Sequence, residues 1–188
     1  MKYFLIQLLV LISLSTVAQF NRDPYRDSDE GNFFLRNTDV YFQKTYNSGV
    51  NFDALEQKLK SYNSPGGGFQ IKRTGENTMN GVIVNYNLNW NYKDLKSRKI
   101  ADFLKYPVNA AFEVEKNGNS YQVTVSNIWF MDVKKPSNKR HLTLESMVTG
   151  EDGVVFTKNK KDLEAMKMID ENFQWIFMMQ GSTQDTRF

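Results

Sequence analysis

The segment VNAAFEVEKNGNSYQVTVS, residues 108–126, decides the fold class. Apolar and polar side chains alternate on both sides of Asn117-Gly118, and strict alternation is typical of a strand with one buried and one solvated face. An Asn-Gly pair between two such runs is a strong hairpin signal, because both central residues of a type I′ turn need a positive φ. The segment therefore predicts two antiparallel strands joined by a tight turn.

A second alternating stretch, GVIVNYNLNWNY, covers residues 81–92. The pattern predicts a strand that buries Val82, Val84, Tyr86, Leu88, Trp90 and Tyr92 and turns Ile83, Asn85, Asn87, Asn89 and Asn91 to the other face. A slip of one residue would bury the asparagines, so the register is well defined. Asparagine is a poor strand former, and the row Asn85, Asn87, Asn89 and Asn91 has two interpretations. It is either a ligand-binding surface of amide donors and acceptors, or the solvated side of an exposed sheet.

The surrounding sequence supplies further strands and two helices. Residues 38–46 alternate as a first strand, and Asn51 is a suitable N-cap for a short helix whose apolar side chains follow a spacing of three and four. The glycines of 66–68 follow that helix and precede a strand, the reverse of a phosphate-binding loop. Near Asn127 the alternation breaks, which predicts a bulge or a strand end buried on both sides. Residues 160–180 carry a long helical stripe of apolar side chains.

Together these elements predict an α+β fold. We expect a curved antiparallel sheet of five or more strands with two main helices packed on one face, in the order β-α-β4-α.

The N-terminus has the pattern of a secretory signal peptide. Lys2 precedes an apolar run from Tyr3 to Leu14, and the small residues Thr16 and Ala18 suit cleavage before Gln19. The run is shorter than the ~20 residues that a transmembrane helix needs. We therefore expect residues 1–18 to be a signal peptide, 19–37 a flexible leader, 38–181 a single α+β domain and 182–188 a tail, with export to the periplasm or the cell exterior and no transmembrane segment after cleavage.

The amino-acid composition limits the kinds of active site and partner that the protein can have. The chain of 188 residues has no cysteine and a single histidine, so thiol catalysis and histidine-rich zinc sites are excluded. With 24 Lys and Arg against 21 Asp and Glu, the charge is nearly balanced, which argues against a nucleic-acid partner. No motif indicates a catalytic residue, a metal or a cofactor.

The strands VYFQKTY and GENTMNGVIVNYNLNW, together with the hairpin AAFEVEKNGNSYQVTVSNIWF, resemble a family of exported bacterial domains of unknown function with a TATA-binding-protein-like fold. The resemblance covers about residues 38–180. It implies a curved antiparallel sheet with helices on one face. It carries over no catalytic residue and does not imply DNA binding.

The sequence thus predicts a secreted or periplasmic, non-enzymatic module that binds an envelope ligand or a protein partner through Asn85, Asn87, Asn89 and Asn91. The alternative is an envelope glycan or ester hydrolase that uses carboxylates or His141. A structural subunit with an exposed apolar patch is the third hypothesis.

Overall fold

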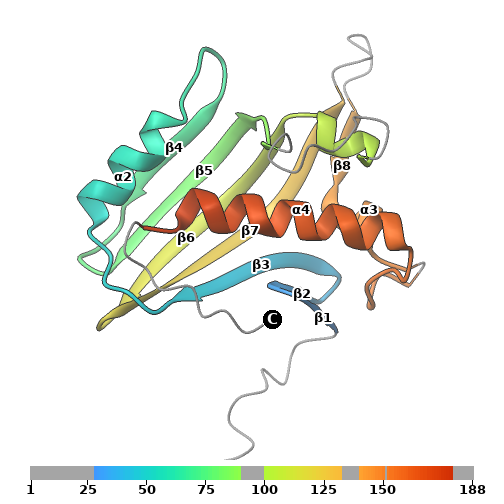
Figure 1. The fold of residues 1–188 in the computed structure, drawn as a ribbon, viewed down its shortest axis with the longest axis horizontal. Helices are drawn as coiled ribbons and strands as arrows, with labels where there is room; N and C mark the ends of the chain where they lie inside the picture. The colour runs from blue at the N-terminus through green and yellow to red at the C-terminus, as the bar shows by residue number, and fades with distance from the viewer. Residues whose placement is uncertain (1–27, 90–99, 133–139, 151, 180–188) are drawn as a thin grey trace, which may run out of the picture.

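One antiparallel sheet forms the body of the protein (Figure 1). The computed structural model describes residues 28–89, 100–132, 140–150 and 152–179. The strands are β1 (Ser28–Glu30), β2 (Phe33–Arg36), β3 (Asp39–Tyr46), β4 (Gly68–Arg73), β5 (Thr78–Tyr86), β6 (Val108–Asn117), β7 (Ser120–Asp132) and β8 (Arg140–Thr143). The helices are α2 (Phe52–Ser61), α3 (Leu144–Val148) and α4 (Lys160–Phe177), with a 3-10 turn, η3, at Asp102–Lys105.

The strands are ordered β1-β2-β3-β7-β6-β5-β4, and β8 pairs with β7 beyond the end of β3. The hairpin predicted at residues 108–126 is confirmed as β6 and β7. Asn117 pairs with Ser120, so the turn lies one residue later than predicted, with Gly118 at φ 58° as its first central residue. The chain order of strands and helices also follows the prediction, with β1, β2, β8 and α3 in addition.

The helices pack on one face of the sheet, as predicted. In Figure 1, α4 crosses that face and α2 lies toward the β4 edge. The side chain of Asn51 caps α2 by accepting from the N–H groups of Asp53 and Ala54 at 2.9 and 3.3 Å. On α4, Phe173 is fully buried and meets Phe42 of β3 edge to face, with ring centroids 5.3 Å apart. The predicted fold class, an antiparallel sheet with helices on one face, is confirmed.

Two buried tyrosines hold the C-terminal end of α4. The hydroxyl of Tyr121 donates to the carbonyl of Phe177 at 2.9 Å and accepts from the N–H of Met179 at 3.0 Å. Tyr46 stacks on Tyr121 at 4.7 Å and donates to the carbonyl of Gln174 at 3.3 Å. The last carbonyls of a helix lack partners within the helix, and the Tyr121 hydroxyl supplies one for Phe177. The carbonyl of Gln174 also accepts from the N–H of Met178 at 2.9 Å, so the Tyr46 hydroxyl is its second donor.

Two bulges flank the same point of β6. In β5 the pairing shifts between Ile83 and Tyr86, where Asn85 takes a φ of 47°. In β7 it shifts beside Asn109 and Ala111 of β6, where Asn127 takes a φ of 50°. The bulge predicted near Asn127 is confirmed. Because a bulge bends and twists its strand, two bulges at one level bend the sheet there.

The bulge at Asn85 corrects the predicted strand at residues 81–92. Ile83 is buried and Val82 is 40% exposed, so the predicted faces are wrong before the bulge. After it, Leu88 is buried as predicted. The reason is that a left-handed residue changes the alternation by one position, so a single phase does not describe the whole stretch.

Residues 28–36, assigned from the sequence to the flexible leader, contain β1 and β2. Phe33 and Leu35 of β2 are buried, with Phe33 packed edge to face on Phe42 at 5.7 Å. The predicted signal peptide, the predicted leader up to residue 27 and the predicted tail at 182–188 lie outside the described residues. No helix in the described part of the chain is long and apolar enough to cross a membrane.

The edge strand β4 has a side-chain partner on its outer side. The amide of Asn63 accepts from the N–H of Phe69 at 2.5 Å and donates to the carbonyl of the same residue at 3.3 Å. Asn63 therefore meets both backbone groups of one edge residue, as a neighbouring strand would.

Candidate functional site

The sheet face opposite the helices is the candidate site, and we call it the open face. It is built from the strand residues that alternate with the buried ones, since neighbouring side chains of a strand point to opposite faces. Pairing aligns these residues in rows across the strands. The first row is Gln43, Thr124, Glu113, Asn80 and Lys72; the second is Thr45, Gln122, Glu115 and Thr78; the third is Ser126, Ala111, Val82 and Gln70.

The first two rows are entirely polar, and neighbouring side chains are hydrogen bonded within them. Gln43 Nε2 donates to Thr124 Oγ1 at 3.4 Å, and with its nitrogen facing the carboxylate the amide of Asn80 donates to Glu113 Oε2 at 3.1 Å. Amides, hydroxyls and carboxylates offer more donors and acceptors than these contacts use. The open face can therefore bind a ligand that both donates and accepts hydrogen bonds.

Two stacked aromatic pairs lie on the open face, beyond the third row. Trp129 of β7 stacks on His141 of β8 with ring centroids 4.2 Å apart and planes 12° apart. Tyr41 of β3 stacks on Phe34 of β2 at 5.2 Å. His141, a candidate residue of the hydrolase alternative, therefore lies against an aromatic ring.

The predicted asparagine row is not brought together on this face. Asn85 sits in the bulge, where its N–H donates to Asn109 Oδ1 at 3.0 Å and its Nδ2 donates to the carbonyl of Gly66 at 3.0 Å. Asn87 and Asn89 are exposed but follow the end of β5, and the N–H of Asn89 donates to Asn172 Oδ1 at 2.8 Å. Asn91 lies outside the described residues. Ligand binding by these asparagines stays a prediction.

Two buried side-chain atoms at the β5 bulge are unpaired among the described residues. Asn109 Nδ2 and Asn85 Oδ1 have no hydrogen-bond partner in the part of the chain that the structure describes. Asn109 pairs directly with Trp129, so the Asn109 side chain lies between the polar rows and the stacked pair of Trp129 and His141. Buried polar atoms normally have partners, so an unpaired donor and an unpaired acceptor on two asparagines joined by a hydrogen bond mark an unusual point of the sheet.

The glycine loop after α2 borders a hollow next to the open face. The hollow has a volume of about 390 Å³, and Gln70 of the third row is among its lining residues. Gly66 and Gly68 adopt φ values of 86° and 136°, which only glycine takes readily. As predicted, the loop ends a helix and leads into a strand.

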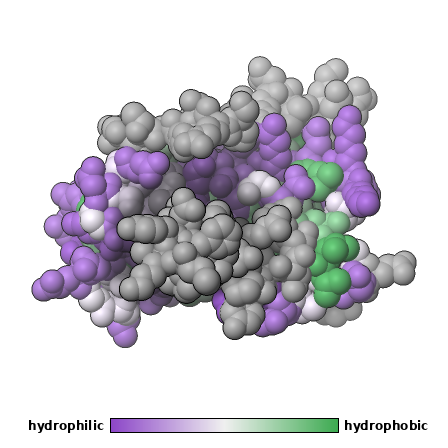
Figure 2. All heavy atoms as spheres, turned by 90° about the horizontal axis from the view of Figure 1, so that it is seen from below, coloured by the Kyte–Doolittle hydropathy of each residue, from purple (hydrophilic) through white to green (hydrophobic). Residues whose placement is uncertain are grey.

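Charge and metal-binding potential also bear on the site. Glu113 and Glu115 stand in the middle of the two polar rows, with Lys72 at the outer end of the first. Among the described residues no group of three or more His, Asp or Glu side chains is placed to hold a metal ion. Figure 2 shows mainly hydrophilic side chains in the view from below, with a smaller hydrophobic group on the side where Figure 1 places α3 and the start of α4.

Fold and site together define an α+β protein with one sheet face packed by helices and the other carrying two polar rows beside two aromatic pairs, of which Phe34 is buried. No protein-family model matches the sequence, and no curated protein matches it. Among solved structures, the chain is similar to a TBP-like protein from Parabacteroides distasonis, with 12% identity and a TM-score of 0.49 over 76% of this chain and 93% of that chain. The fold described here rests on this chain's own strands and helices.

Proposed function

We propose that this protein is an exported, non-enzymatic module that binds a neutral glycan of the bacterial envelope on its open face. The observation that carries the proposal is the pair of continuous polar rows, the first across β3, β7, β6, β5 and β4 and the second across β3, β7, β6 and β5, with stacked aromatic rings beside them. Export is proposed on the signal-peptide pattern of residues 1–18.

The chemistry of the open face favours a polyhydroxylated ligand. A sugar hydroxyl both donates and accepts, so it matches rows in which amides, hydroxyls and carboxylates alternate. The ring face of a sugar carries C–H groups, and these pack well on flat aromatic surfaces such as Tyr41 and Trp129. Glu113 and Glu115 disfavour a polyanion such as a nucleic acid, because like charges repel across the interface.

The test uses soluble malto-, cello- and chito-oligosaccharides as probes. A ligand that binds only the native protein raises its melting temperature, so each probe is first screened by thermal shift. Binding of an active probe is then compared between wild type, Gln43→Ala with Thr124→Ala in the first row, and Lys161→Ala on α4 as the control. We expect the row variant to lose about tenfold or more in affinity, as two lost hydrogen bonds imply, and the control to keep it.

A further variant, Asn87→Ala with Asn89→Ala, separates the open face from the asparagine site predicted from the sequence. Both residues are exposed and lie outside the rows, so the open-face proposal expects unchanged binding. Loss of binding in this variant alone would refute the open face and favour the asparagines. No shift with any probe would refute the glycan proposal.

A further inference from the structure

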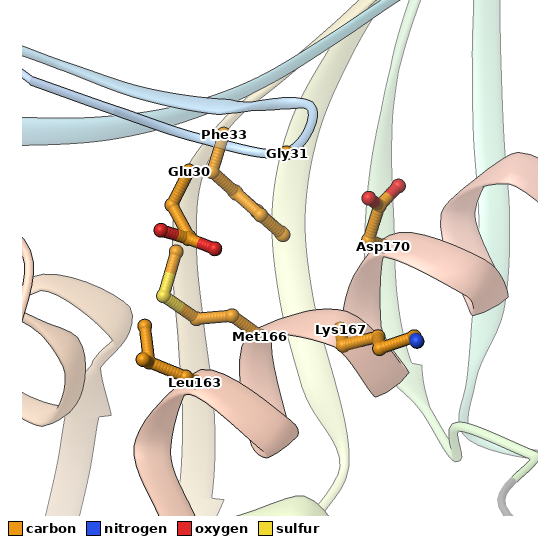
Figure 3. Close-up of a pocket in the computed structure, with 7 residues that line it drawn as sticks. All are labelled: Glu30, Gly31, Phe33, Leu163, Met166, Lys167 and Asp170. Carbon is orange, nitrogen blue, oxygen red and sulfur yellow. The ribbon is translucent and has the colours of Figure 1, made fainter. Parts of the chain in front are cut away.

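A cavity lies between the β1–β2 turn and α4, on the helical side of the sheet and away from the open face (Figure 3). Its volume is about 180 Å³. It is lined by Glu30, Gly31 and Phe33 from the turn and by Leu163, Met166, Lys167 and Asp170 from α4.

The carboxylate of Asp170 has an acceptor position left for a ligand. Its Oδ1 accepts from Asn32 Nδ2 at 2.8 Å and from Gln174 Nε2 at 2.7 Å, whereas Oδ2 accepts only the longer bond from Asn32, at 3.0 Å. Each carboxylate oxygen can accept about two hydrogen bonds, so Oδ2 keeps one position. Gly31 leaves this oxygen uncovered, because a Cβ at Gly31 would lie 3.2 Å from Oδ2.

The described residues provide no counter-ion for this carboxylate or for that of Glu30. Neither Asp170 nor Glu30 forms an ion pair with any lysine or arginine in the described ranges. In Figure 3 the two carboxylates lie on opposite sides of Phe33, and the side chain of Lys167 extends away from Glu30 and runs below Asp170. Two carboxylates and one lysine give the lining a net charge of −1, which a single positive charge balances.

The rest of the lining is apolar. Phe33 and Met166 are each only 1% exposed, and Leu163 lies beside Met166 in Figure 3. An inorganic cation would gain nothing from these side chains, since hard cations need several oxygen ligands. An aliphatic chain would remove its own apolar surface from water as it enters.

We propose that this cavity binds a primary ammonium group on a short aliphatic arm, the chemistry of a lysine side chain. The ammonium donates to Asp170 Oδ2, the alkyl arm lies over Phe33 and Met166, and Glu30 adds a second negative charge at the rim. The proposal is independent of glycan binding on the open face.

The test is an NMR titration of the full chain, labelled at the methionine methyl groups, with n-butylammonium chloride. The methyl group of Met166 reports on the cavity, and that of Met131, on the opposite face of the sheet, is the internal control. For a ligand of so few atoms we expect a dissociation constant on the order of 1 mM. n-Butanol, which lacks the charge, should bind about tenfold more weakly, and n-butyrate should not bind.

Three variants locate the charge. Asp170→Asn keeps an oxygen that accepts from Asn32 and Gln174 but removes the charge, and should weaken binding about tenfold or more. Glu30→Gln, in an exposed position, should weaken n-butylammonium binding severalfold. This variant tests the role of the negative charge if Asp170→Asn does not fold. Glu164→Gln removes the same charge from an exposed position of α4 outside the cavity and should leave binding within about twofold.

Saturable movement of the Met166 signal, with this order of ligands and variants, supports the proposal. It is overturned when Met166 does not respond, when n-butanol binds as tightly as n-butylammonium, or when Glu164→Gln loses as much affinity as Asp170→Asn.

Discussion

Replacing Tyr121 with phenylalanine tests how the end of α4 is held on the sheet. Tyr121 is completely buried, and its hydroxyl both donates to the carbonyl of Phe177 and accepts from the N–H of Met179. The substitution keeps the ring and leaves two backbone groups without their partner. A buried polar group that loses its partner costs about 1–3 kcal/mol, and Met179 is half-buried, so water can reach part of its site.

We therefore expect Tyr121→Phe to lower the free energy of unfolding by about 3 kcal/mol, and the melting temperature by roughly 6–12 °C. Urea denaturation measures the loss as a lower midpoint at an unchanged m-value. Tyr46→Phe is the matched control, because it removes one hydroxyl from the same stacked pair and breaks a single, longer bond of 3.3 Å. It should cost about 1 kcal/mol. A loss for Tyr121→Phe no larger than that of Tyr46→Phe would refute the assignment of two buried hydrogen bonds to this hydroxyl.

Two further predictions concern pH and glycine. Burial raises the pKa of Tyr121 from 10.0 to about 12, although the hydrogen bond from the N–H of Met179 acts to lower it. Between pH 10 and about pH 12 the tyrosine hydroxyl therefore loses its proton in the unfolded chain and keeps it in the native protein. The contribution of Tyr121 to stability should therefore be intact below about pH 10 and fall by up to about 3 kcal/mol as the pH rises to about 12, and urea midpoints across this range should fall less steeply for Tyr121→Phe. Gly81→Ala should destabilise by about 2 kcal/mol or more, because its Cβ would lie 2.4 Å from the carbonyl oxygen of Gln70 and 2.5 Å from Cζ of Phe112. Gly75→Ala, with nothing within 4 Å, should change stability by less than about 0.5 kcal/mol, and equal losses in thermal melts of the two variants would contradict the close approach at Gly81.

Local signals explain what could be predicted of the fold. The hairpin depends on alternation over a few residues and a turn at Gly118, and α2 depends on a cap at Asn51, so each is encoded within one short stretch. The buried and exposed faces of the asparagine-rich strand were predicted wrongly for an equally local reason. Asparagine adopts a left-handed φ more readily than most residues, and Asn85 does so in the middle of an otherwise regular pattern.

The candidate site could not be predicted from the sequence, because it depends on which strands are neighbours. The first row brings Gln43 beside Thr124 through the pairing of β3 with β7, two strands far apart in the chain. The stack of His141 on Trp129 likewise requires the pairing of β8 with β7. Alternation identifies the polar side of each strand but does not order the strands, so it yields the polar residues without the surface that they make.

The amide of Asn63 also has a bearing on how the protein behaves at high concentration. A strand at the border of a sheet is a template on which another chain can grow, and self-association through such borders leads to aggregation. By occupying the N–H and the carbonyl of Phe69, Asn63 blocks the first residue pair at which a second molecule would have to align along β4. A single neutral side chain therefore protects this position of the β4 edge from pairing with another chain.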